Sequence, residues 1–167
     1  MHPNEQLIET FYSNFQKKNG KGMAECYHRD IQFSDPVFPN LQGSNAMEMW
    51  NMLCTQAKGF ELKYSGIKAD DHEGIAYWEA KYDFSRTGRR VHNRVEANFQ
   101  FQEGKIIWHQ DIFSFWKWSF MALGITGLIL GWTPIVRNKV QRQASNNLEK
   151  FKNQQVTAKA NKNMHMD

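Results

Sequence analysis

The middle of the chain, from residue 60 to residue 116, alternates apolar and polar side chains with a period of two. Successive side chains of a β-strand point to opposite faces of a sheet, so this period predicts strands. Turn-forming residues divide the region into four expected strands, at residues 60–69, 75–86, 90–102 and 105–116. The connections are short, which requires antiparallel pairing. Any fold for this chain must therefore contain an antiparallel meander of four strands.

Helical periodicity flanks this meander on both sides. The first apolar stripe consists of Leu7, Ile8, Phe11, Tyr12 and Phe15. Its spacings of one, three and four residues predict an amphipathic helix. A second helix is expected from Ser44 or Asn45 and a third after Pro134, with a short strand at residues 31–36 between the first two. Helices followed by a meander predict an α+β fold.

Composition excludes several classes of protein. A hydrophobic fraction of 41% and an aromatic fraction of 14% exclude a disordered chain. The net charge of +4 arises in the tail, because residues 137–167 carry seven basic and two acidic side chains. A basic tail on a near-neutral body argues against nucleic-acid binding. Cys26 and Cys54 are too few for a disulfide framework, and no signal peptide is evident, so we expect reduced thiols and a cytoplasmic protein.

The segment from Ser119 to Val136 is largely apolar and about as long as the shortest membrane spans. We expect it to form a helix or lid over an apolar cavity, with a membrane-surface anchor, aided by the basic tail, as the alternative. The expected organisation is a domain at 1–118, a helical extension packed on it at 119–151, and a frayed polar tail at 152–167.

The two faces of the expected strands differ in polarity. One side of the strand at 75–86 carries Ala76, Trp78, Ala80, Tyr82 and Phe84, and the inner side of the next carries the odd-numbered residues from 91 to 101. The last strand is apolar on both sides. One side carries Ile106, Trp108, Ile112 and Trp116, and the other carries Ile107, His109, Asp111, Phe113 and Phe115. Burial on both sides predicts a second layer on the convex face of the sheet, which a homodimer partner would supply.

Several segments together resemble the SnoaL-like polyketide cyclases and ketosteroid isomerases of the nuclear-transport-factor-two-like superfamily. They are the run Tyr27 to Pro36, Gly43 before a helix, the hairpin around Gly88, and the last strand from Gly104 to Trp116. The resemblance covers residues 5–118. It implies a cone-shaped α+β fold, in which a curved antiparallel sheet wraps around the N-terminal helices, with a pocket at the wide end and dimerisation through the convex face.

The resemblance also implies roles for individual residues. Asp35 falls where ketosteroid isomerases keep the aspartate that moves a proton between carbons. His109 and Asp111 match the histidine and aspartate that face the cavity in the cyclases. The oxyanion donors of the isomerases are replaced by Phe11 and Ala97, so we do not expect a steroid isomerase. The alternatives are that Asp35 caps a turn, and that His109 and Asp111 only satisfy each other's hydrogen bonds.

A pocket in such a cone is expected to hold a small apolar ligand. Its expected lining is Phe11, Phe33, Trp50, Trp78, Tyr82, Asn93, Ala97, Phe99 and Phe113. An epoxide hydrolase would need Arg94, Glu96 and Asp111 together, but the strand period places Arg94 and Glu96 on the outer face. No metal-binding spacing or cofactor fingerprint is evident, so no metal and no cofactor are expected.

The sequence therefore predicts one of two functions. The first is cofactor-free acid–base chemistry, an isomerisation, cyclisation or dehydration, by Asp111 and His109 with assistance from Asp35. The second is a non-catalytic ligand-binding or dimerisation module whose cone is filled by side chains.

Overall fold

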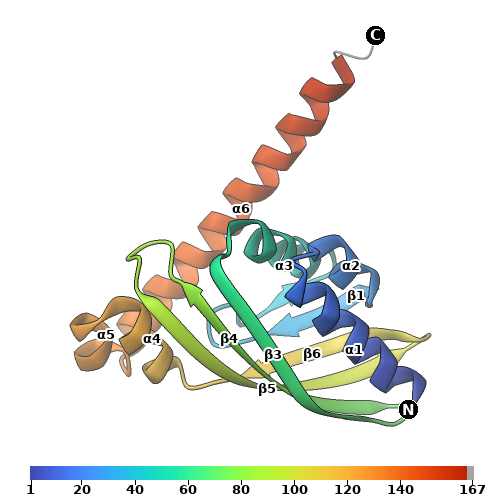
Figure 1. Ribbon diagram of the computed structural model, residues 1–167. Helices are drawn as coiled ribbons and strands as arrows, with labels where there is room; N and C mark the ends of the chain where they lie inside the picture. Colours follow the sequence, from blue (N-terminus) through green and yellow to red (C-terminus); the bar gives the residue numbers. More distant parts are fainter. Residues whose placement is uncertain (165–167) are drawn as a thin grey trace.

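A computed structural model describes residues 1–164 of the chain, with side chains up to Asn161 apart from Lys159. A curved sheet wraps around three N-terminal helices, and a long C-terminal helix crosses the wide end of the resulting cone (Figure 1). The helices are α1 (Pro3–Gln16), α2 (Gly20–Glu25), α3 (Ser44–Gln56), α4 (Phe115–Leu123), α5 (Ile125–Leu130) and α6 (Pro134–Met164). The strands are β1 (Tyr27–Ser34), β2 (Leu41–Gln42), β3 (Lys58–Ala69), β4 (Glu73–Asp83), β5 (Arg90–Gln102) and β6 (Lys105–Ile112). The α+β cone is therefore confirmed.

The six strands form one open sheet in the order β2-β1-β6-β5-β4-β3. Strands β3 to β6 are the expected antiparallel meander. The sheet as a whole is mixed rather than purely antiparallel, because β1 runs parallel to β6. Strand β1 also begins at Tyr27, earlier than the strand expected at residues 31–36. The irregular register between Tyr27 and Gln32 explains why the period of two does not reveal this start.

A bulge in β6 changes which side chains face the core. Gln100 pairs with Trp108 and Phe101 pairs with Ile106, so the register shifts at Ile107. Ile106 and His109 are both fully buried on the concave side. The sequence-based expectation that Ile106 and His109 lie on opposite faces is therefore wrong.

The last strand ends earlier than the alternation suggests. β6 stops at Ile112, whereas a strand was expected to continue to residue 116. The side chain of Ser114 accepts a hydrogen bond from the backbone N–H of Lys117 and so caps the start of α4. The boundary expected at residue 118, between the first domain and the helical extension, falls inside α4.

The main core lies between the concave face of the sheet and helices α1 and α3. Helix α1 contributes Ile8, Phe11, Tyr12 and Phe15 to it, as expected from its apolar stripe. Helix α6 also belongs to this core, because Leu148 and Phe151 are buried in it. Beyond this contact α6 extends away from the body (Figure 1). Residues 165–167 of the expected polar tail lie outside the described residues, and the division of the chain into domains stays a prediction.

The contact of α6 with the core can be tested by comparing Phe151 with an exposed residue of the same helix. Phe151 is 5% exposed and Val156 is 67% exposed. Phe151→Ala leaves a cavity in the core, so we expect it to lower the free energy of unfolding by about 3 kcal/mol. Val156→Ala should change it by less than about 0.5 kcal/mol. Urea unfolding measures both values, and equal effects would show that α6 does not belong to the core.

Candidate functional site

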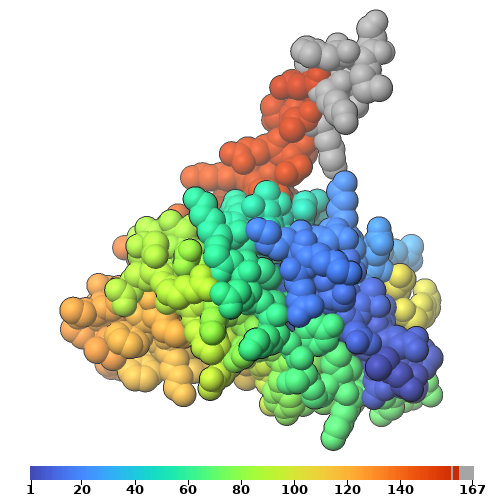
Figure 2. Space-filling model, viewed as in Figure 1, coloured from blue at the N-terminus to red at the C-terminus, as the bar shows by residue number. Residues whose placement is uncertain are grey.

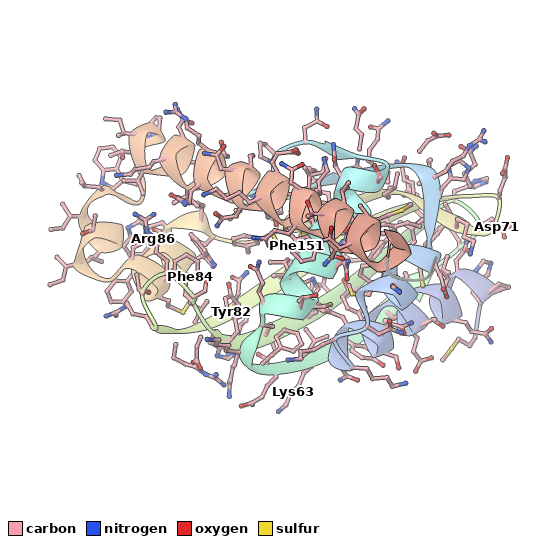
Figure 3. All side chains as sticks on the ribbon, turned by 90° about the horizontal axis from the view of Figure 1, so that it is seen from above. Lys63, Asp71, Tyr82, Phe84, Arg86 and Phe151 are labelled. Carbon is pink, nitrogen blue, oxygen red and sulfur yellow. The ribbon has the colours of Figure 1, made fainter. Side chains whose placement is uncertain are left out.

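A cavity of about 440 Å³ opens at the wide end of the cone. Strands β4 to β6 and α3 line its inner part, and α4, α6 and the turn after β4 line its outer part. Seen from above, Tyr82, Phe84 and Arg86, which line it, lie toward the α4–α5 end of the molecule, whereas Asp71 lies at the opposite end (Figure 3). Apolar side chains provide most of the lining, as is typical of small-molecule sites.

Only part of the expected lining reaches this cavity. The residues that do are Trp50, Trp78, Tyr82, Asn93 and Phe113. The residues that do not are Phe11, Phe33, Ala97 and Phe99, which lie in the packed core with at most 2% of their surface exposed. These four residues therefore do not line the cavity as expected, because the narrow end of the cone is filled by α1 and by aromatic packing around His109.

Five side chains, four of them buried and one half-buried, form a continuous chain of hydrogen bonds at the inner wall of the cavity. The indole N–H of Trp50 donates to the hydroxyl of Tyr27 over 2.7 Å, and this hydroxyl lies 2.7 Å from Nδ1 of His109. Nε2 of His109 lies 3.0 Å from Oδ1 of Asp111, which also accepts the indole N–H of Trp78 over 3.2 Å. The chain connects α3, β1, β6 and β4.

The donors in this chain fix the protonation of its members. An indole N–H can only donate, so the Tyr27 oxygen accepts from Trp50 and its own proton is directed to Nδ1 of His109. Burial, reinforced by the charge of Asp111, raises the pKa of Tyr27 far above its usual value, so this proton is retained. Nδ1 of His109 then accepts from Tyr27, and Nε2 is the ring nitrogen that donates to Asp111.

Asp111 joins this buried chain to the cavity. Its side chain lines the cavity although the residue is only 3% exposed. Oδ1 accepts both hydrogen bonds, and Oδ2 has no partner among the described residues. His109 is fully buried behind it and does not line the cavity. His109 and Asp111 therefore share a face, as expected, but only Asp111 can reach a ligand.

Asp35 is a second carboxyl group in the same cavity. It follows β1, and its Oδ1 accepts the backbone N–H groups of Val37 over 2.6 Å and of Phe38 over 2.5 Å. Burial raises the pKa of Asp35 to about 7, and the negative charge of Asp111 adds to this rise, while the two backbone donors oppose it. Asp35 thus caps a turn and also faces the cavity with a pKa close to neutral pH.

Two uncharged polar groups complete the cavity. The hydroxyl of Tyr82 accepts the indole N–H of Trp118 over 2.9 Å, which leaves its own proton available to donate. Burial raises the pKa of Tyr82 to about 12, so this proton stays in place. Asn93 is 7% exposed, lines the cavity, and has no side-chain hydrogen bond among the described residues. Its amide can therefore bond to a ligand.

The sequence did not identify every residue of this site. Tyr27 was missed because the irregular start of β1 hides it from a period-of-two search. Trp118 was missed because it falls between the strand expected at residues 105–116 and the apolar segment expected from Ser119. The three residues of the possible epoxide-hydrolase site are separated, since Arg94 is exposed and pairs with Glu79 at 3.4 Å whereas Asp111 faces the cavity. Within residues 1–164, no group of three or more His, Cys, Asp or Glu side chains could hold a metal ion.

Comparisons with known proteins agree with this architecture. A sequence model of the SnoaL-like domain matches residues 8–109. An LEH-like epoxide hydrolase from M. tuberculosis is 18% identical, with a TM-score of 0.60, over 77% of this chain and 96% of that chain. A putative polyketide cyclase from Xanthomonas campestris pv. campestris is 15% identical, with a TM-score of 0.59, over 70% of this chain and 94% of that chain.

A hypothetical protein with a ketosteroid isomerase-like fold from Catenulispora acidiphila, in complex with trimethylamine, is 10% identical to this chain. Its TM-score is 0.62, over 77% of this chain and 97% of that chain. At such identities these likenesses show a shared fold. No curated protein sequence matches the chain.

The hydrogen-bond chain predicts opposite behaviour for two buried tyrosines. Tyr27→Phe leaves Trp50 without an acceptor and His109 without a donor, so we expect a loss of about 2 kcal/mol in the free energy of unfolding. The hydroxyl of Tyr12 is buried and has no partner, so Tyr12→Phe should be neutral or stabilising. Denaturant unfolding of both variants decides this. A similar loss in both would show that the Tyr27 bonds do not stabilise the fold.

The raised pKa of Asp35 predicts a pH-dependent stability. Because the folded-state pKa of about 7 exceeds the ordinary value of 3.8, folding favours the protonated acid, and stability is lost as the pH rises from about 4 to about 7. Asp35→Asn keeps the acceptor oxygen and cannot ionise. At pH 8 the free energy of unfolding of Asp35→Asn should exceed that of wild type by about 2 kcal/mol, which is less than the full pKa shift implies because water in the cavity screens the charge. At pH 4 the two free energies should be almost equal.

Thermal unfolding between pH 4 and pH 8 measures this difference. Asp71→Asn, at a carboxylate whose side chain is 86% exposed, is the matched control and should show no comparable trend. A constant difference between Asp35→Asn and wild type across this range would contradict the raised pKa.

Proposed function

The chain belongs to the SnoaL-like domain family, and from that premise we propose that it binds a small, largely apolar molecule and catalyses a proton transfer on it without a cofactor. The observation that carries this proposal is that Asp35 and Asp111 line the same apolar cavity. Such a pair is suited to an isomerisation, cyclisation or dehydration of a substrate that carries its own carbonyl group.

Asp35 is the proposed acid–base group. A catalytic acid or base works best when its pKa lies near the operating pH, and that of Asp35 is about 7. Its Oδ1 is held by two backbone N–H groups, which leaves Oδ2 to accept a proton from a substrate carbon. The electron pair of the broken C–H bond then moves onto the substrate carbonyl oxygen.

Tyr82 and Asn93 are the proposed partners of that oxygen. The hydroxyl proton of Tyr82 and the amide of Asn93 are both free to donate, and both residues line the cavity. Hydrogen-bond donors that are in place before the reaction stabilise the developing negative charge. The proton on Asp35 then returns to another carbon in an isomerisation or passes to the leaving hydroxyl in a dehydration.

Asp111 supplies a second carboxylate, and its negative charge helps to keep the pKa of Asp35 high. His109 is a positioning residue in this scheme, because it reaches the cavity only through Asp111. Tyr27 and Trp78 hold this pair from either end. The likeness to a putative polyketide cyclase supports this reaction class. An epoxide opening is not supported, since Arg94 and Glu96 do not line the cavity.

A generic proton-abstraction probe tests the proposal without knowledge of the natural substrate. 5-Nitrobenzisoxazole is aromatic and compact, and removal of its ring C–H proton breaks the N–O bond to give a coloured cyanonitrophenolate. We expect wild type to accelerate this elimination, with kcat/KM rising as the pH passes through about 7, when Asp35 loses its proton. Asp35→Asn should lower kcat/KM by about 100-fold.

Two further variants assign the roles. Asp111→Asn removes the charge that raises the pKa of Asp35, so it should shift the midpoint of the pH profile downward and retain activity. Glu96→Gln, outside the cavity, is the control and should behave as wild type. Loss of activity in Asp111→Asn but not in Asp35→Asn would show that Asp111, and not Asp35, is the acid–base group. A wild-type rate no faster than that of free acetate would reject catalysis and leave the non-catalytic binding module.

A further inference from the structure

The C-terminal helices carry an exposed apolar surface that the proposed reaction does not use. It is formed by α4, α5 and the start of α6, which project from one end of the cone (Figure 2). We call this surface the apolar tip. Its exposed side chains are Trp116, Phe120, Ile125, Leu128, Ile129, Leu130, Trp132 and Ile135, each 41% to 78% exposed. A contiguous apolar surface of this kind marks an interaction site.

Helix α4 carries large apolar side chains on both its inner and its outer side. Its inner side packs Phe115, Trp118 and Ala122 into a second small core with Val91 and Val140. Its outer side exposes Trp116 and Phe120. Large apolar side chains on two sides of a helix favour cover on both sides, and the described residues cover only the inner one.

The indole N–H groups of the tip are bonded within it, whereas Lys117 and Thr126 are exposed. The indole N–H of Trp116 donates to the carbonyl of Leu128 over 3.1 Å, and that of Trp132 donates to the carbonyl of Ile129 over 2.9 Å. Gly127 lies directly against the backbone of Ser119, which holds α5 tightly on α4. The tip is therefore a preformed surface that needs no rearrangement to expose its apolar groups.

Exposed basic side chains lie within the tip and directly after it in the sequence, and acidic ones are absent from this stretch. Residues 112–148 contain Lys117, Arg137, Lys139 and Arg142, and no aspartate or glutamate. All four basic residues are exposed, and Arg137 lies over the ring of Phe115 at 5.2 Å. This combination of an apolar centre and a uniformly positive margin is complementary to an anionic lipid surface.

We propose that the apolar tip docks this protein onto an anionic membrane surface. Among the described residues no helix is long and apolar enough to cross a bilayer, so the tip would lie in the headgroup region rather than span the membrane. A second copy of the chain is a poorer occupant, because pairing two tips would bring their positive margins together. This inference is independent of the proposed proton transfer.

Vesicle co-sedimentation of the full chain tests the proposal. We expect wild type to bind vesicles of phosphatidylcholine containing about a quarter phosphatidylglycerol, to bind pure phosphatidylcholine at least tenfold more weakly, and to dissociate as the salt concentration rises. The double variant Ile129→Glu, Trp132→Glu places two acidic groups in the tip and should reduce binding at least tenfold. Val156→Glu, at an equally exposed apolar residue far along α6, should bind as wild type does.

A charge variant and an oligomer measurement complete the test. Lys117→Gln with Lys139→Gln removes two basic groups and leaves the apolar surface intact, so binding should fall by about fivefold for each charge. Circular dichroism melting confirms that the variants fold. The proposal is overturned if wild type fails to bind anionic vesicles at low salt. It is also overturned if Ile129→Glu, Trp132→Glu leaves vesicle binding unchanged but dissociates a dimer in sedimentation velocity, which would assign the tip to self-association.

Discussion

Burial of the Asp111 carboxyl group sets a condition that the rest of the core has to meet. A carboxylate with 3% exposure among aromatic rings is strongly unfavourable unless donors compensate for the lost water. Trp78 and His109 supply these donors, and His109 is in turn oriented by Tyr27, which is held by Trp50. Because these side chains come from β4, β6, β1 and α3, one polar chain fixes how α3 packs against three strands. Aromatic packing around it excludes water, which strengthens each of its hydrogen bonds.

The same arrangement gives Asp35 and Asp111 different surroundings in the cavity. Oδ1 of Asp111 accepts both of its hydrogen bonds, so its Oδ2 is free to contact a molecule in the cavity. Burial raises the pKa of Asp35, the charge of Asp111 adds to this rise, and only two backbone donors oppose it. A carboxyl group whose pKa is brought near neutral pH by its surroundings is typical of acid–base sites. The hydrogen-bond chain therefore contributes to the chemistry of the site as well as to the stability of the core.

Much of this arrangement could be predicted from the sequence, and the failures have physical causes. The period of two in residues 75–101 correctly separated the inner from the outer side chains, and so placed Trp78, Tyr82 and Asn93 correctly in the cavity. It failed where the backbone departs from regular pairing, at the bulge next to Ile107 and at the irregular start of β1, which concealed Tyr27. Alternation also cannot distinguish a buried strand from an apolar helix, so the first two residues of α4, Phe115 and Trp116, were assigned to the last strand. The boundary between cavity and packed core depends on how far α1 and α3 penetrate the cone, which no local pattern encodes.

The C-terminal part of the chain connects the cavity to the molecular surface. The SnoaL-like match ends at residue 109, yet Asp111 and parts of α4 and α6 line the cavity. Trp118 on the inner side of α4 donates to Tyr82 in the cavity wall, while Trp116 and Phe120 on its outer side belong to the apolar tip. The two surfaces are thus separated by a single helix, about 10 Å across. A molecule apolar enough to fill the cavity also partitions into a bilayer, and docking through the tip would bring the cavity close to the phase in which such a molecule is concentrated. Taken together, the two proposals give α4 one role on each of its sides, which accounts for the large apolar side chains on both its inner and its outer side.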